Sequence, residues 1–264
     1  MRSSIPIYNS LASEYEQGFY DVPHRKAYDL LAWEQVSKLL PSAPGTIVEA
    51  GCGAGRWVER LLALGHQVIG IEQAGQMIEV LHRRNYGERF TLFEQDIETV
   101  SLPSGSVDVV LAMGSLQYTQ RPADTVRSFA TWTKPGGSVC VLTDSLVALV
   151  LELLRNGKAE EAQDRLKTRT GVWKQHGVEA DLHLFDRDTL EAYFRDAGLA
   201  DVRTRGLLVT ASAWGIENCQ SEMTSNELAF LHLERTLSRF SAVADVGKQI
   251  LTVGRKAMPS GEDS

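Results

Sequence analysis

The sequence lacks the cysteine patterns of disulfide-rich and zinc-binding proteins. Its 264 residues include only three cysteines, Cys52, Cys140 and Cys219, and none belongs to a CxxC pair. Such isolated cysteines favour reduced thiols inside a cell over a disulfide framework or a zinc site. Asp144 follows an expected strand, but no second carboxylate with the spacing of a magnesium site accompanies it. We therefore expect no bound metal.

Long apolar runs and basic runs are also missing. The first ten residues, MRSSIPIYNS, have no apolar core of the length that a signal peptide needs. The most apolar stretch, 139–154, contains Asp144 and Glu152, which makes it too polar to cross a bilayer. The formal net charge is −7, and an acidic surface repels the phosphates of nucleic acid. The sequence thus predicts a cytoplasmic protein, with neither nucleic acid nor a membrane as partner.

What the sequence does contain is a regular alternation of strand-like and helix-like segments. Short, apolar, β-rich runs predict strands at 46–50, 67–72, 89–96, 107–114 and 138–143. Helical patterns lie at 25–40, 57–62, 74–84 and 122–133, and KPGG (134–137) predicts a turn. This order is typical of βαβ units, so the fold class is α/β with a doubly wound, largely parallel sheet.

The pattern changes after residue 144. Residues 145–182 are charge-rich and helical in character, which predicts a helical insertion that caps the sheet or contributes to a dimer contact. The further expected elements are a helix at 186–198 with a capping box of Asp188 and Glu191, a strand near 202–210, a helix near 225–240 and a last strand at 248–256. Residues 258–264 are expected to be disordered.

Three glycines follow the first expected strand in IVEAGCGAGR (47–56). Glycines after a strand and before a helix let a ligand approach the backbone, and the helix that follows offers unpaired N–H groups to an anionic group. Such a loop is a weak signal by itself. Glu72, however, ends the second strand, where a carboxylate can accept hydrogen bonds from both hydroxyls of a ribose. Asp96 ends the third strand in the same way.

The order of the motifs makes the functional interpretation specific. VEAGCGAGR, IGIEQAGQM, FEQDIE, VDVVLAMGSLQY and KPGGSVCVL follow one another over residues 45–145. Together they closely resemble the class I S-adenosylmethionine-dependent methyltransferases. The resemblance implies a Rossmann-like, seven-stranded, mostly parallel sheet whose last strand is antiparallel. It also implies a methyltransferase domain over 41–257, and an N-terminal helical lid over 1–40 that closes over the cofactor.

Carried over by position, the motifs imply a set of residues that bind S-adenosylmethionine. They lie in the glycine loop, at the strand ends that follow it and in the lid: Glu49, Gly51, Cys52, Gly53, Gly55, Glu72, Gln73, Met77, Asp96, Ile97, Met113, Gly114 and Tyr15. Within this set, Glu49 would lie under the methionyl amino group and Glu72 against the ribose hydroxyls. Asp96 and Ile97 would read the adenine edge, while Met113 and Gly114 would face the sulfonium.

The same resemblance implies a small-molecule methyl acceptor. Aromatic residues gather in the N-terminal segment and after the fifth strand, which favours an aromatic or otherwise apolar acceptor bound by a monomer or homodimer. A general base is needed only if the acceptor atom must lose a proton. Among six histidines, His183 is the best candidate for that base, because it lies just before the helix at 186–198.

Two other functions stay open. An NAD-dependent oxidoreductase would also use Glu72, but its loop usually reads G-x-G-x-x-G, and here Arg56 stands where the last glycine is expected. A non-catalytic partner protein that binds the cofactor without transferring methyl would keep the same glycines and acidic residues. Product formation with an acceptor separates the second alternative from an enzyme.

Overall fold

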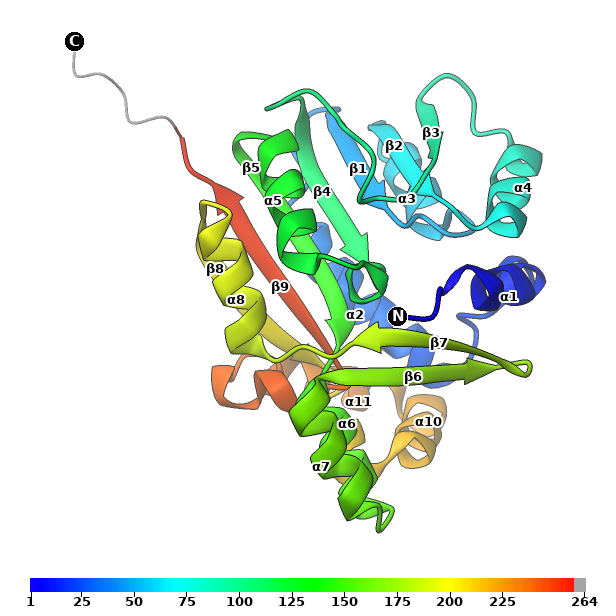
Figure 1. Cartoon of the computed structure of the whole chain (residues 1–264), viewed down its shortest axis with the longest axis vertical. Coiled ribbons are helices and arrows are strands. Elements are labelled where there is room, and N and C mark those ends of the chain that lie inside the picture. Colours follow the sequence, from blue (N-terminus) through cyan, green and yellow to red (C-terminus); the bar gives the residue numbers. More distant parts are fainter. Residues whose placement is uncertain (259–264) are drawn as a thin grey trace.

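The apolar runs of the sequence form one seven-stranded sheet in the computed structural model, which describes residues 1–258 (Figure 1). The strands lie in the order β3-β2-β1-β4-β5-β9-β8. They are β1 (Thr46–Ala50), β2 (Gln67–Glu72), β3 (Phe90–Glu94), β4 (Val107–Met113), β5 (Thr133–Asp144), β8 (Leu199–Leu207) and β9 (Gln249–Lys256). Strands β1 to β5 are parallel, and β9 is antiparallel to both of its neighbours, β5 and β8. The expected sheet with an antiparallel last strand is confirmed.

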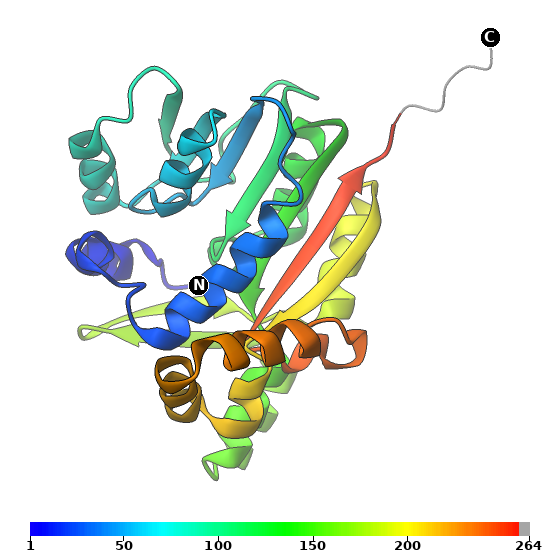
Figure 2. The same cartoon turned by 180° about the vertical axis from the view of Figure 1, so that it is seen from behind.

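Helices cover both faces of this sheet (Figures 1 and 2). One face carries α2 (Pro23–Val36), α3 (Arg56–Ala63) and α11 (Glu227–Leu237), and the other carries α5 (Pro122–Trp132) and α8 (Arg187–Asp196). Alternate residues of one strand serve the two cores: Val109 packs in the first and Val110 in the second. A strand covered on both sides needs apolar residues on both faces, which is why VDVVLAM has no polar alternation.

The insertion between β5 and α8 is only partly helical, which corrects the expectation for 145–182. It begins with α6 (Leu146–Arg155) and α7 (Ala159–Thr168), but continues as a hairpin of β6 (Thr170–Gln175) and β7 (Val178–His183). The hairpin turn consists of His176 and Gly177, both with positive φ, as a tight two-residue turn requires. The hairpin strands stand apart from the main sheet.

Other boundaries also differ from expectation. Strand β5 already begins at Thr133, and KPGG (134–137) forms an irregular bulge within it: Thr133 pairs with Val107 and Ser138 with Val109, and Gly136 has a φ of 79°. Helix α8 is capped by Asp186, which accepts the N–H of Thr189 at 2.9 Å, and not by Asp188. The helix expected near 225–240 is α11, preceded by α9 (Thr210–Trp214) and α10 (Ile216–Ser225). The expectation of a disordered tail at 258–264 lies outside the described residues, apart from Met258.

The N-terminal helix α1 (Ile5–Gln17) lies beside α4 (Gly75–Arg84) and the β6–β7 hairpin, away from the sheet itself (Figure 1). Its buried residues Ile7 and Leu11 pack with Met77 and Val80 of α4 and with Ala180 of β7. The helix therefore bridges two parts of the chain that are distant in sequence. Within residues 1–258, no helix combines the length and the apolar character that a membrane crossing would need.

Candidate functional site

A cavity, here called the inner cavity, opens at the carboxyl ends of β1, β2 and β4. Ten of the residues expected to bind the cofactor line it: Tyr15, Glu49, Gly51, Cys52, Gly53, Glu72, Gln73, Ile97, Met113 and Gly114. The carboxyl ends of parallel strands meet at one edge of a sheet, which is why segments so far apart in sequence come together here. Arg56 of α3 and Ser115 complete this part of the wall.

Three of the expected residues, Met77, Asp96 and Gly55, do not line the inner cavity. Met77 is fully buried against α1. Asp96 turns its carboxylate to the backbone N–H of Glu98, at 2.9 Å. Gly55 packs against α4 and the loop that follows it: a Cβ there would lie 2.8 Å from a methyl carbon of Leu81 and 2.5 Å from the hydroxyl of Tyr86, and its φ is 86°. The third glycine of the loop thus serves the start of α3.

The glycine loop approaches the end of β4 very closely. Gly51 has a φ of 79°, and a Cβ at this position would clash with the Cβ of Ser115. The Ser115 hydroxyl in turn donates to the carbonyl of Ala50 at 2.5 Å. Gly53 also has positive φ, but a Cβ there would have no heavy atom within 4 Å. Gly51 therefore permits close packing, whereas Gly53 leaves space beside the cavity.

Glu72 holds the loop in place from the end of β2. Its Oε2 accepts the N–H of Gly53 at 2.8 Å, and its Oε1 accepts the N–H groups of Gln73 and Ala74, both at 2.8 Å. Burial raises the pKa of this carboxyl, and the three N–H donors partly oppose the rise. One lone pair of Oε2 is still free to accept a further hydrogen bond.

Glu49 is the most deeply buried carboxylate of the inner cavity, with 2% of its surface exposed. Burial raises its pKa well above the usual value, although the nearby Arg56 lowers it. Its Oε2 has no hydrogen-bond partner. Arg56 is committed elsewhere: it pairs with Asp29 of α2 and lies under the ring of Tyr20, 3.3 Å from its centroid. A buried acceptor of this kind calls for a ligand that carries N–H groups.

Aromatic residues of the N-terminal segment form another part of the wall of the inner cavity. Tyr8, Tyr15 and Tyr20 line the inner cavity. Tyr15 stacks on Phe19 with ring centroids 4.0 Å apart, and Tyr8 meets Trp173 of β6 edge to face at 5.4 Å. The spacing of these residues in the sequence does not predict that they line this cavity, because their position depends on where the fold places α1.

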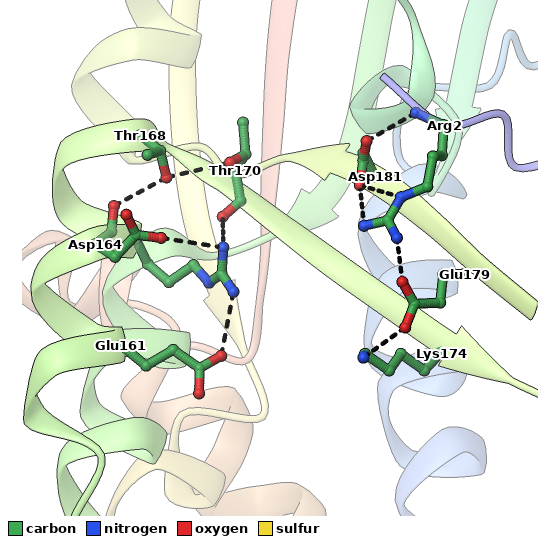
Figure 3. Close-up of polar contacts among 9 residues, drawn as sticks. Arg2, Glu161, Asp164, Thr168, Thr170, Lys174, Glu179 and Asp181 are labelled. Carbon is green, nitrogen blue, oxygen red and sulfur yellow. Dashed lines mark hydrogen bonds and ion pairs between the residues drawn. The ribbon is translucent and has the colours of Figure 1, made fainter.

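The first residues of the chain are tied to the hairpin by ion pairs (Figure 3). The guanidinium of Arg2 donates to Asp181 of β7 at 2.6 and 2.9 Å and also pairs with Glu179. The backbone joins in, because the N–H of Arg2 donates to the Asp181 carboxylate at 2.7 Å. A separate polar cluster fixes α7 to β6, where Arg165 donates to Glu161 and to the carbonyl of Thr170 (Figure 3). Arg2 thus holds the beginning of the chain against the hairpin.

A second cavity, here called the outer cavity, adjoins the first and is the larger, at about 410 Å³ against about 110 Å³. The two cavities share six lining residues: Tyr8, Tyr15, Tyr20, Met113, Gly114 and Tyr118. Most other residues that line the outer cavity come from α2, α6, α9, the β6–β7 hairpin and the ends of β5 and β9, including Leu149, Trp173 and Leu182. A volume of this size suits a small organic molecule.

His183 lines neither cavity, so the structure does not support it as a general base. Side chains alternate along a strand, and Leu182 and Leu184 face the outer cavity while His183 between them does not. Its ring lies near Phe185, with centroids 6.1 Å apart, and its Nε2 is buried without a partner. Burial lowers the pKa of His183.

Sequence reasoning missed a polar group at the floor of the outer cavity. It consists of Gln117 in η1 (Leu116–Tyr118), Thr143 and Asp144 at the end of β5, and Gln249 at the start of β9. Asp144 and Gln249 are cross-strand partners in the sheet. Asp144 ends an expected strand, which was a signal, but its amide partners come from segments more than twenty residues away and have no motif.

The glycine loop, the carboxylate that ends β2 and the sheet order define the class I S-adenosylmethionine-dependent methyltransferases. Comparison with known proteins agrees. Residues 48–141 match the family described as "Methyltransferase domain". Residues 48–141 therefore form a methyltransferase domain.

Two relatives and one solved structure illustrate the similarity. The ubiquinone biosynthesis O-methyltransferase of Albidiferax ferrireducens is 36% identical over 41% of this chain and 45% of that protein. The one of Xanthomonas axonopodis pv. citri is 29% identical over 66% of this chain and 71% of that protein. The crystal structure of an S-adenosylmethionine-dependent methyltransferase from Mesorhizobium loti, at 16% identity, covers 85% of this chain and 97% of its own, with a TM-score of 0.57. This last likeness shows the fold.

Proposed function

We propose that this protein transfers the methyl group of S-adenosylmethionine to a small molecule held in the outer cavity. One observation carries the proposal: the two cavities meet at Met113 and Gly114, which line both. A sulfonium methyl placed beside the end of β4 would point from the inner cavity into the outer one. The names of the relatives support a small-molecule acceptor, since both methylate an oxygen in ubiquinone biosynthesis by name.

The residues of the inner cavity suit each part of the cofactor. The unpartnered, buried Oε2 of Glu49 fits the methionyl ammonium, which has N–H donors and a positive charge. The remaining lone pair of Glu72 fits a ribose hydroxyl. The space beside Gly53 admits the part of the cofactor that joins the ribose to the methionyl ammonium. Gln73 and Ile97 fit the two sides of the adenine.

Positioning is the main contribution of the protein to the reaction. The cofactor supplies a methyl group that its sulfonium already activates for displacement. The chain holds this group and the acceptor in line, and such alignment is worth roughly 7–11 kcal/mol in favourable cases. Tyr8, Tyr15 and Tyr20 of the proposed lid line both cavities, and their rings would limit the access of water to the reacting atoms.

The aromatic and apolar residues that line the outer cavity support an aromatic or apolar acceptor body. Trp173, Tyr118 and Leu149 are among them. Residues 1–40 act as the lid, and the α6–α7 helices with the β6–β7 hairpin form the cap of a domain over 41–257. We further propose that the protein works in the cytoplasm as a monomer or homodimer, without nucleic acid as a partner.

Calorimetric titration with S-adenosylhomocysteine, with NAD run beside it, tests the cofactor assignment. Micromolar binding of the first and none of the second is expected, and the reverse result would make the protein an oxidoreductase. Transfer of labelled methyl groups to a panel of quinols, phenols and amines then tests turnover. Cofactor binding without any methylated small molecule would favour the non-catalytic partner protein, and label found only in added protein or RNA would contradict a small-molecule acceptor.

A further inference from the structure

The polar floor of the outer cavity is a carboxylate surrounded by unsatisfied oxygen atoms. Asp144 accepts a hydrogen bond from the Nε2 of Gln117 at 3.2 Å, and the side-chain amide of Gln249 also hydrogen-bonds it. The Oε1 atoms of Gln117 and Gln249 and the hydroxyl of Thr143 are buried and have no hydrogen-bond partner. Gln117 is 5% exposed and Thr143 1%, so these groups lie well inside the protein. Buried polar atoms left unpaired cost about 1–3 kcal/mol each.

The orientation of the Gln117 amide follows from its neighbour. A carboxylate only accepts hydrogen bonds, so the NH₂ group of Gln117 must face Asp144. Its carbonyl oxygen then faces away from the carboxylate and needs a donor. The side-chain carbonyl oxygen of Gln249 is also buried without a hydrogen-bond partner, so it needs a donor as well. The polar floor thus consists of hydrogen-bond acceptors that lack donors.

No side chain of the described residues supplies a cation to Asp144. The nearest candidate, Lys248, also lines the outer cavity, but its Nζ pairs with Glu152 at 3.3 Å. Arg25 is held over the ring of Phe19, 3.6 Å from its centroid. Burial raises the pKa of Asp144, and the Lys248 ammonium and the Gln249 amide only partly oppose this rise. A cationic ligand would relieve the uncompensated burial of this carboxylate.

We propose that the floor formed by Gln117, Asp144 and Gln249 anchors a protonated primary amine of the methyl acceptor. An ammonium group has three N–H donors and no acceptor, which suits a carboxylate whose oxygens can accept further hydrogen bonds. A hydroxyl has a single donor and no charge, so it would leave the carboxylate without a counter-charge. The aromatic faces of Tyr118 and Trp173 in the same cavity add attraction for a cation.

The anchored amine is not itself the methylated atom. Asp144 and Gln249 line only the outer cavity, whereas the cofactor is assigned to the inner one. The acceptor would extend from this anchor toward Met113 and Gly114, where its nucleophilic atom meets the methyl group. The inference rests on the proposed function, since it concerns the acceptor of that same reaction.

Matched pairs of probes test the anchor on the full chain saturated with S-adenosylhomocysteine. Tyramine is compared with tyrosol, and phenethylamine with 2-phenylethanol, because each pair differs only in an amine against a hydroxyl. Calorimetry should show the amines binding about tenfold tighter or more, as expected for charge-assisted hydrogen bonds. Amines that bind no better than their alcohols, including the case in which neither binds, would overturn the proposal.

Two variants locate the effect. Asp144→Asn should abolish the preference for amines, whereas Asp196→Asn, which removes an exposed carboxylate of α8 that lines neither cavity, should keep it. Asp144 does not line the inner cavity, so the affinity for S-adenosylhomocysteine reports whether Asp144→Asn is folded. A folded Asp144→Asn protein that still prefers amines would also overturn the proposal. Failure of the wild type to bind S-adenosylhomocysteine at all would instead contradict the proposed function.

Discussion

The Oε2 of Glu72 accepts the backbone N–H of Gly53 at 2.8 Å, so the carboxylate that ends β2 fixes the glycine loop that follows β1. The same side chain lines the inner cavity. Glu72 therefore has two tasks, which are to shape the loop and to accept a hydrogen bond from the ligand. Both are lost together when the carboxylate is removed.

Glu72→Ala should weaken binding of S-adenosylhomocysteine about 10- to 100-fold, because hydrogen bonds to a charged group contribute about 1.5–3 kcal/mol. Titration calorimetry measures the change. Glu94→Ala is the matched control, since Glu94 ends the neighbouring strand β3 but lies outside the inner cavity. Equal affinity in wild type and Glu72→Ala would contradict the ribose assignment.

The close approach of Gly51 to Ser115 predicts unequal effects of alanine in the loop. Gly51→Ala combines a strained positive φ with a clash against the Ser115 Cβ and should cost about 3 kcal/mol of unfolding free energy. Gly53→Ala has positive φ but open space and should cost about 1 kcal/mol. Urea unfolding checks both values.

A double variant separates the clash from the strain. Adding Ser115→Gly to Gly51→Ala should recover part of the lost stability relative to Ser115→Gly alone, because the opposing Cβ is gone. Purely additive losses would mean that the backbone strain accounts for the whole effect.

The part of the fold between 46 and 144 could be predicted because its signals are local. Strands covered on both faces are apolar throughout, and β1 and β2 have the boundaries that their apolar runs indicate. The β6–β7 hairpin was missed for a physical reason. Its strands carry Lys174, Glu179 and Asp181, which face solvent and form ion pairs. In sequence the segment therefore resembles the charged helix before it. Only the two-residue turn His176–Gly177 marks it.

The candidate site divides in the same way. Glu49 and Glu72 lie at the ends of β1 and β2, and Gly51 directly follows β1, so position in sequence was enough to find them. The floor of the outer cavity joins Gln117, Asp144 and Gln249, whose meeting depends on the sheet placing β9 beside β5. No spacing in the sequence encodes such a contact.

The placement of His183 predicts that it is dispensable for methyl transfer. Since its side chain faces away from the outer cavity, His183→Gln should keep kcat within about threefold of wild type once an acceptor is known. Single-turnover measurement of methyl transfer at saturating cofactor gives the comparison. A loss of about 100-fold or more, with cofactor affinity intact, would restore His183 as the general base.

His24 predicts a loss of stability in mild acid. Burial, and then Arg25 and Lys248, lower its pKa from 6.5 to about 4. Below pH 6.5 the unfolded chain therefore binds a proton that the folded protein does not, so stability is full above that pH and falls as the pH drops toward 4. The loss at pH 4 should be about 2 kcal/mol from this half-buried group.

His24→Asn should flatten this dependence, because the Asn oxygen can accept the Gln220 amide as the neutral ring does at 2.7 Å. Urea unfolding at pH 5 and pH 7 measures the difference. Burial also lowers the pKa of His66 and His183, so a smaller slope should remain. The exposed His82 serves as control through His82→Asn, and an unchanged slope in His24→Asn would show that His24 is not the source.

The pairing of Arg2 with Asp181 predicts how fast the lid opens. Ser4 and Ile5, which follow Arg2, line the inner cavity, so release of the cofactor requires this end of the chain to move. Arg2→Ala removes the side-chain pairs with Asp181 and Glu179 and should raise the dissociation rate of S-adenosylhomocysteine roughly threefold, since exposed ion pairs are individually weak. Stopped-flow displacement measures this rate. Lys174→Ala removes a cation that pairs only with Glu179 and should leave the rate unchanged. If Arg2→Ala releases the ligand no faster than wild type and Lys174→Ala do, then the pairing of Arg2 with Asp181 and Glu179 does not limit release. The lid would then open about a hinge that follows Arg2 in the chain.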